Sequence, residues 1–164
     1  MTANLEALGQ YLSVHLLQQG HSNGQFFRAT LLQLNQKNVV AAYSSCSLQH
    51  SFFSALLANA NVTPIGKFLF ATESLVKRNN DMQIKLYNQA ELHNWLFERS
   101  RCAANAVDAP PPEEHPLTSF LNSHYPLAQR FWVRHSTFAY QQEILELSEV
   151  ILPEIYASCY IEQR

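Results

Sequence analysis

Strand-like segments stand near both ends of the chain, and helical segments fill the middle. Alternating or continuously apolar residues of the kind found in strands occupy residues 11–19, 26–34, 39–45, 130–139 and 144–152. Asn35 to Asn38 separates the second strand from the third, and Asn tolerates the left-handed backbone that a hairpin turn needs. This order predicts an α+β fold with a single antiparallel sheet, in which the two ends of the chain pair and the helices pack on one side.

The central part of the chain carries helical patterns interrupted by turn residues. The expected helices are residues 47–59, a short segment opened by Pro64, residues 76–102 and residues 117–124, with another short helix over residues 2–10. Residues 108–116 contain three consecutive prolines and two glutamates, which predict an extended polar loop.

Composition narrows the classes of function. The chain has 164 residues, 47% of them hydrophobic, which is enough for one domain with a real core. The formal net charge is −2 and the basic residues form no run, so we expect neither nucleic acid nor an anionic membrane surface as a partner. We also expect no membrane span and no signal peptide, and therefore a cytoplasmic location.

No pattern for a metal or cofactor is visible in the sequence. The three cysteines form no CxxC pair, and the chain has neither a P-loop nor a GxGxxG nor an HExxH motif. We therefore expect no disulfide framework, no metal and no cofactor.

Two segments, with a third that is weaker, resemble the chorismate lyase family. Residues 63–70, Thr-Pro-Ile-Gly-Lys-Phe-Leu-Phe, resemble the family's Thr-Pro-Leu-Gly-Arg-Tyr-Leu-Phe. Residues 147–153, Leu-Ser-Glu-Val-Ile-Leu-Pro, resemble its Leu-Thr-Glu-Leu-Phe-Leu-Pro, and residues 134–136 stand where the family has a basic strand. Residues 27–32 resemble its Leu-Arg-Glu-Ile-Leu-Leu. The resemblance covers most of residues 1–164 as one domain, except an enlarged insertion at about 78–129.

The resemblance implies an enzyme that removes pyruvate from chorismate and leaves 4-hydroxybenzoate. It further implies flap helices over an enclosed pocket, and no cofactor. Arg28 would hold the ring carboxylate, because a guanidinium meets a carboxylate in a bidentate pair. The backbone N–H of Ile65, at a helix start, would be a second donor to the ligand. Met1 aligns with a family position that contacts the ligand through its backbone.

Glu149 matches the family's acid beside the leaving ether oxygen. Its neighbours Leu147, Val150 and Ile151 are apolar, and an acid in an apolar setting tends to stay protonated. It would then donate a proton as the C–O bond breaks. Arg28 and Glu149 are the expected catalytic residues, and we expect them to line one closed pocket.

Two departures from the family pattern concern the surroundings of this site. Tyr43 stands where the family often has Arg, and Ala29 replaces the Glu beside Arg28. Either both members of a structural Arg–Glu ion pair of the family have been replaced together, or the pocket has changed. The prolines at 110–112 lie where the family keeps a flap, and a longer flap would alter substrate choice.

Three interpretations of function remain open at this stage. The first is the lyase. The second is a non-catalytic domain of the same fold that binds a small aromatic or cyclohexadiene carboxylic acid, as in a ligand sensor. The third is an interaction protein that kept the fold and lost the site, with exposed aromatics around Trp95, Phe97 and Trp132. A monomer or a weak dimer fits all three.

Overall fold

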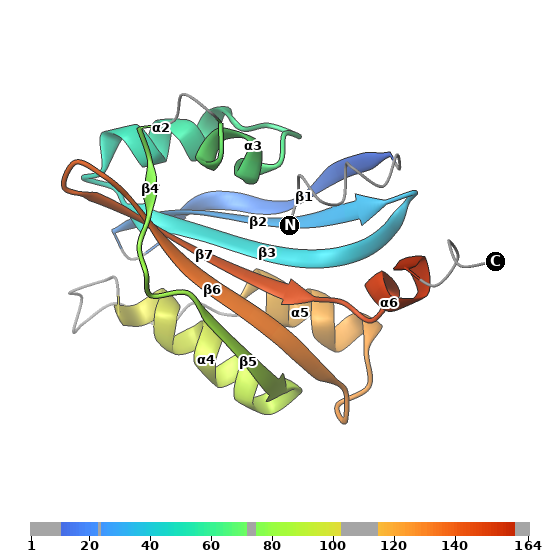
Figure 1. The fold of residues 1–164 in the computed structure, drawn as a ribbon. Helices are drawn as coiled ribbons and strands as arrows, with labels where there is room; N and C mark the ends of the chain where they lie inside the picture. The colour runs from blue at the N-terminus through green and yellow to red at the C-terminus, as the bar shows by residue number, and fades with distance from the viewer. Residues whose placement is uncertain (1–10, 23, 72–74, 103–114, 160–164) are drawn as a thin grey trace.

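A computed structural model of the chain describes residues 11–22, 24–71, 75–102 and 115–159 (Figure 1). The strands are β1 (Leu12–Ser22), β2 (Gln25–Leu34), β3 (Lys37–Ser47), β4 (Lys77–Arg78), β5 (Gln83–Asn88), β6 (Arg130–Tyr140) and β7 (Glu143–Ile151). The helices are α2 (Ser51–Asn59), α3 (Ile65–Leu69), α4 (Gln89–Cys102), α5 (Pro116–His124) and α6 (Glu154–Cys159). The α+β class is therefore confirmed, while the helix expected over residues 2–10 lies outside the described residues.

All seven strands join one antiparallel sheet. The order across it is β1-β2-β3-β7-β6-β4, and β5 also pairs with β6. The strands from the two ends of the chain meet where β3 pairs with β7, with Ala42 opposite Glu149. This pairing of the two ends is the one that the sequence predicts.

The hairpin between β2 and β3 turns at Asn35 and Gln36. Both residues have positive φ, 49° and 67° respectively. Two successive positive φ values are the signature of a type I′ turn, whose twist matches that of the flanking strands. The predicted hairpin is confirmed, and it sets the register of the first three strands.

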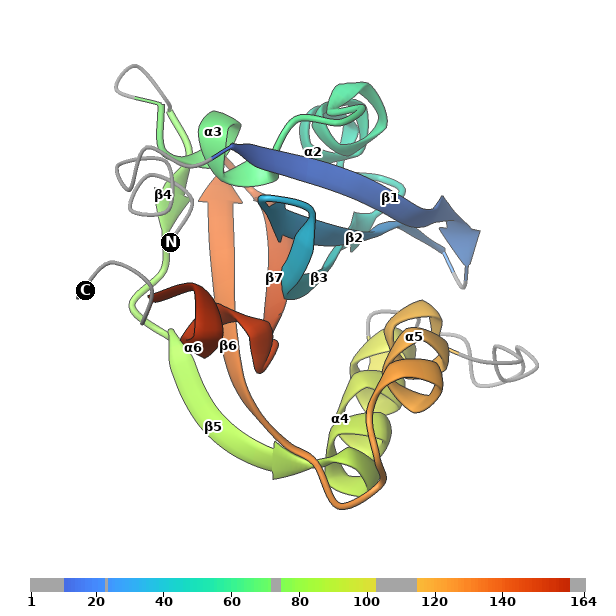
Figure 2. The same ribbon diagram turned by 90° about the vertical axis from the view of Figure 1, so that its right-hand side faces the viewer.

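Helices cover both faces of the sheet, so the expectation of helices on one side alone is wrong. Figure 2 shows α2 and α3 on one side of the strands and α4 and α5 on the other. Residues of β2 alternate between the two resulting cores: Phe26 packs with Phe53 of α2, and Phe27 packs with Leu96 of α4. Nearly every residue of β2 is buried for this reason. We call the two sides the α3 face and the α4 face.

The helix expected over residues 76–102 begins only at residue 89. Residues 77–78 and 83–88 form β4 and β5, which lie along the free edge of β6. Met82, which lies between these two strands, is 44% exposed. Unpaired backbone groups along the eleven-residue β6 favour added strands over a helix there.

The start of α4 has a clear local cause. The Asn88 side chain accepts a hydrogen bond from the Glu91 N–H at 2.9 Å, and the Glu91 carboxylate accepts one from the Asn88 N–H at 3.0 Å. This reciprocal pair is a capping box, which satisfies two backbone donors at a helix start. The helix predicted at residues 117–124 is confirmed as α5.

Candidate functional site

Glu149 lies near the end of β7 and faces α3. Its cross-strand partners are Ala42 on β3 and Arg134 on β6. The Arg134 Nε and Nη2 atoms both lie 2.5 Å from Glu149 Oε2. The two side chains are 18% and 8% exposed, so this is a largely buried ion pair.

The ion pair gives Glu149 a different setting from the apolar one that the sequence suggests. Strand alternation sends the neighbouring Ser148 and Val150 to the α4 face, so the apolar residues beside Glu149 in sequence do not all surround its carboxyl group. The sequence suggests a carboxyl group in an apolar setting, whereas the structure pairs it with the Arg134 guanidinium. As it stands, Glu149 is an acceptor paired with a cation.

Arg28 occupies the middle of β2 and is 1% exposed. Its Nη2 donates to the carbonyl oxygen of Asn61 and, at 3.5 Å, to that of Thr63, both in the segment that leads into α3. Its Nε is buried without a hydrogen-bond partner. Burial lowers the pKa of Arg28, because the charged guanidinium is poorly solvated inside the protein.

No carboxylate pairs with Arg28 among the residues that the structure describes. Two carbonyl oxygens are its only acceptors there. A buried guanidinium without an anionic partner is costly, and such groups are normally paired.

Ile65 is the first residue of α3, and Pro64 is its N-cap. A proline fits this position because its fixed φ, here −57°, leads directly into the helix. The first N–H groups of a helix have no intrahelical acceptor, so the Ile65 N–H is available to another partner. The Ile65 side chain is buried against the sheet.

A small cavity separates α3 from the sheet. It is lined by Thr30, Leu32, Ala42, Pro64, Ile65, Gly66, Phe70, Arg134, Leu147 and Glu149. Its volume is about 20 Å³, which holds roughly one water molecule. The structure thus brings Ile65 and Glu149 to one cavity and adds Arg134.

Arg28 lies on the same face of the sheet but does not line this cavity. Its row across the strands is Arg28, Ser44 and Leu147, and the next row on that face contains Thr30, Ala42 and Glu149. Arg28 and Glu149 are therefore neither on opposite faces nor in direct contact. Met1 and the prolines at 110–112 lie outside the described residues.

Tyr43 and Ala29 are direct cross-strand partners. Both belong to the core of the α4 face, and the Tyr43 ring stacks on Phe27 with centroids 5.9 Å apart. They point away from the cavity beside Glu149. This geometry favours the loss of a paired structural contact over a changed pocket.

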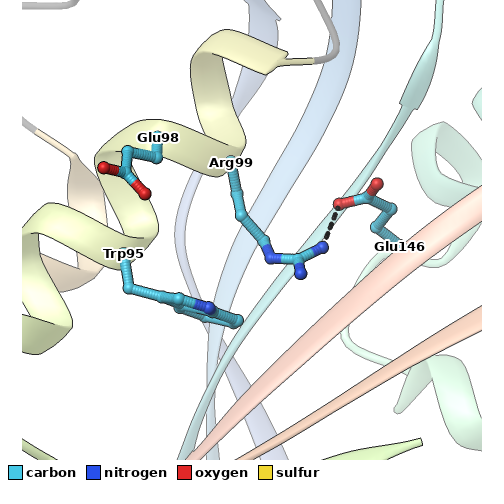
Figure 3. A pocket seen from close by; sticks show the side chains of 4 residues that line it. All are labelled: Trp95, Glu98, Arg99 and Glu146. Atoms are coloured by element: carbon cyan, nitrogen blue, oxygen red, sulfur yellow. Dashed lines mark hydrogen bonds and ion pairs between the residues drawn. The ribbon is translucent and has the colours of Figure 1, made fainter. Parts of the chain in front are cut away.

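A second hollow lies on the α4 face (Figure 3). It has a volume of about 260 Å³ and is lined by Trp95, Glu98, Arg99 and Glu146. The Arg99 guanidinium lies over the Trp95 ring, 5.0 Å from its centroid, and its Nη1 is 3.5 Å from Glu146 Oε2. Trp95 and Arg99 are four residues apart on one helix, a spacing that could have indicated their contact in the sequence.

His135 connects the second hollow to the sheet. Its Nε2 lies 2.8 Å from Arg99 Nη1 and its Nδ1 lies 3.1 Å from Ser148 Oγ. Since Arg99 can only donate, the contact fits a neutral ring that accepts at Nε2. Burial, with the nearby Arg99 charge as a further cause, lowers the pKa of His135 to about 4. Arg99 therefore already has a neutral and an anionic partner.

Comparisons with known proteins do not assign the chain to a family. No protein-family model and no curated protein sequence matches the chain. Among the described residues, no cluster of His, Cys, Asp and Glu side chains is arranged to hold a metal ion. None of the helices in the described ranges is both long and apolar enough to cross a membrane.

Proposed function

We propose that the protein binds a small aromatic or cyclohexadiene carboxylic acid between α3 and the sheet, and that it removes pyruvate from chorismate to give 4-hydroxybenzoate. The observation that carries the proposal is the buried Arg28, which lacks a carboxylate partner among the described residues. A ligand carboxylate supplies that partner. The free Nε–H of Arg28 is a donor that such a carboxylate can use.

The spacing of Arg28 and Glu149 suits a ligand with two polar ends. Glu149 on β7 is separated from Arg28 on β2 by the intervening strand β3, and it lies two residues further along the strand direction. At ordinary strand spacings, this offset corresponds to roughly 12 Å between the two Cα atoms. Two long side chains on one face then reach toward a ring between them. Arg28 holds the ring carboxylate, the Ile65 N–H is a second donor, and Glu149 acts at the far end of the ring.

The proposed reaction balances without a cofactor. The bond between the ring carbon and the ether oxygen breaks, and its electron pair leaves with the enolpyruvyl oxygen, which gains a proton. The ring loses a proton and becomes aromatic, and the enol form becomes pyruvate. Glu149 serves the proton transfer at the leaving oxygen, and binding fixes the substrate for that step.

Ligand entry requires α3 to move away from the sheet. A cavity of about 20 Å³ is far smaller than an aromatic acid. Helix α3 has five residues and buries only Ile65 and Leu69, so a local opening is a modest change. Closure over the ligand would exclude water from the reacting bond.

Binding without chemistry is the second candidate, and the ion pair of Glu149 favours it. In the structure, the Glu149 carboxyl group is already engaged by Arg134 at 2.5 Å. If that pair persists when a ligand is bound, the domain retains aromatic acids without converting them. This alternative shares the same pocket and the same role for Arg28.

The test is incubation of the purified protein with chorismate, with pyruvate and 4-hydroxybenzoate followed by chromatography. We expect equimolar release by the wild type, and losses of roughly tenfold or more in kcat/KM in both Arg28→Met and Glu149→Gln, because each removes a charge-assisted contact. Arg130→Ala is the matched control, since Arg130 is exposed on the same sheet.

The outcomes separate the two candidates. Wild-type turnover that both variants lose supports the lyase. Binding of 4-hydroxybenzoate without turnover, weakened in Arg28→Met and retained in Arg130→Ala, selects the binding domain. A protein that neither binds nor converts these acids contradicts both.

A further inference from the structure

We propose that Arg134 determines specificity by binding the second carboxylate of a dicarboxylate ligand, and that this ligand carboxylate displaces Glu149 from Arg134. The inference rests on the proposed function. Arg134 lines the cavity beside α3 together with Glu149 and Ile65. Two guanidinium groups thus face α3 from the sheet, Arg28 on β2 and Arg134 on β6, on either side of the Glu149 strand.

The existing contacts of Arg134 leave room for a second anion. Its Nε and Nη2 atoms both lie on one oxygen of Glu149. Such a contact uses one carboxylate oxygen in place of the two-oxygen fork that Arg favours. The Nη1 atom takes no part in this contact with Glu149.

The chemistry of the proposed substrate places its second carboxylate near Arg134. In an enolpyruvyl ether, the carboxylate is bonded to the same carbon as the ether oxygen. Glu149 is the residue proposed to act at that oxygen, and Arg134 is its direct cross-strand neighbour. A carboxylate so close to Glu149 therefore meets the Arg134 guanidinium.

Displacement would also free the Glu149 carboxyl group from its ion pair. That carboxyl group would then be able to turn toward the ether oxygen of the ligand. A monocarboxylate cannot displace it, because its single carboxylate is held by Arg28.

The test compares 4-hydroxybenzoate with 3-(carboxymethoxy)-4-hydroxybenzoate by isothermal titration calorimetry. The second ligand carries an added carboxymethoxy group and therefore a second carboxylate. We expect the wild type to bind the dicarboxylate more tightly. In Arg134→Gln, affinity for the dicarboxylate falls by roughly 10- to 100-fold, as expected for a charge-assisted contact, while affinity for 4-hydroxybenzoate changes less than about threefold.

Two further variants keep the result interpretable. Arg134→Gln combined with Glu149→Gln avoids a buried unpaired carboxylate, and compared with Glu149→Gln alone it should show the same selective loss of the dicarboxylate. Arg130→Ala, at an exposed position of the same strand, should bind both ligands as the wild type does. Circular dichroism confirms that each variant is folded.

Failure of the inference is distinguishable from failure of the proposed function. If the wild type binds both ligands and the Arg134 variants weaken both equally, Arg134 has no selective role and the inference is wrong while the pocket stands. If the wild type binds neither ligand, the proposed function is wrong and the inference is overturned with it.

Discussion

Arg28 is the residue whose position is hardest to explain by stability alone. It is 1% exposed and bonded only to carbonyl oxygens among the described residues. Replacement of a buried charge by an apolar side chain of similar volume is often neutral or stabilising. Residues kept at a cost to stability are typical of functional sites.

We therefore predict that Arg28→Met leaves the free energy of unfolding within about 1 kcal/mol of the wild type, as measured by urea denaturation. Phe53→Ala is the comparison, because Phe53 is a fully buried core residue whose truncation costs about 3–5 kcal/mol. A loss in Arg28→Met as large as that in Phe53→Ala would show that Arg28 is a structural residue.

His115 is a buried histidine that caps α5. Its Nδ1 accepts a hydrogen bond from the Leu117 N–H at 3.2 Å, and its Nε2 is buried without a partner. Burial, with His93 as a further cause, lowers the pKa of His115 to about 3. The folded state therefore resists protonation of this ring at a pH where the unfolded chain accepts it.

Stability should fall as the pH falls. Loss begins near pH 6.5, the ordinary pKa of histidine, because the unfolded state then binds the proton and the folded state does not; it continues toward the folded pKa of about 3. His135, with a pKa lowered to about 4, adds to the same trend.

We predict a shallower decline in His115→Asn, since Asn can still cap the helix but does not titrate. Thermal unfolding of both proteins at several pH values between 7 and 4 measures the two slopes. Equal slopes in the two proteins would contradict the assigned role of His115.

At the scale of elements, α2 is capped by a residue from the opposite end of the chain. The carboxylate of Glu143, at the β6–β7 turn, accepts hydrogen bonds from the N–H groups of Phe52 and Phe53 at 3.2 and 3.1 Å. The N-cap residue His50 supplies no side-chain cap. Glu143 therefore fixes the start of α2 to the C-terminal hairpin.

We expect Glu143→Ala to lower the free energy of unfolding by about 1–2 kcal/mol, as the loss of a helix cap and of a favourable charge at a helix start does. Glu98→Ala is the control, because Glu98 is exposed on α4 and surface substitutions cost less than about 0.5 kcal/mol. If the two variants were equally stable, the hydrogen bonds of Glu143 to α2 would not stabilise the protein, and the prediction would be wrong.

The elements show where sequence patterns suffice and where they fail. Segments with strong local patterns, such as the hairpin at Asn35 and the strand before it, are predicted correctly. The strands at residues 77–88 are missed, because what stabilises them is the edge of β6, over forty residues later in the chain. The capping box of Asn88 and Glu91 is the local signal that marks the true helix start.

At the scale of the whole molecule, the register of strand pairing determines which residues come together in the candidate site. Residues 28 and 149 come to one face through the β2–β3 and β3–β7 pairings. The resemblance indicates both residues, but not their surroundings. The pairing of Arg134 with Glu149 could have been found by counting outward from the predicted β6–β7 turn, since each is six residues from the hairpin pair Tyr140–Glu143.

The hollow beside Trp95 could not be predicted in the same way. It depends on how α4 packs across the sheet, which brings Arg99 to Glu146 and His135. Periodicity shows which side of a helix is apolar, but not where that side crosses a strand. Within the described ranges, the cavity beside α3 and the hollow beside Trp95 lie on opposite faces of the sheet. A structure with a bound ligand shows which of them the ligand occupies.

The most direct test of the central claim is a crystal structure of the protein grown with 4-hydroxybenzoate. The account predicts the ring between α3 and the sheet, its carboxylate on the Arg28 guanidinium and its hydroxyl beside Glu149. A ligand seated against Trp95 and Arg99 on the other face, with Arg28 still bonded only to carbonyl oxygens, would contradict it.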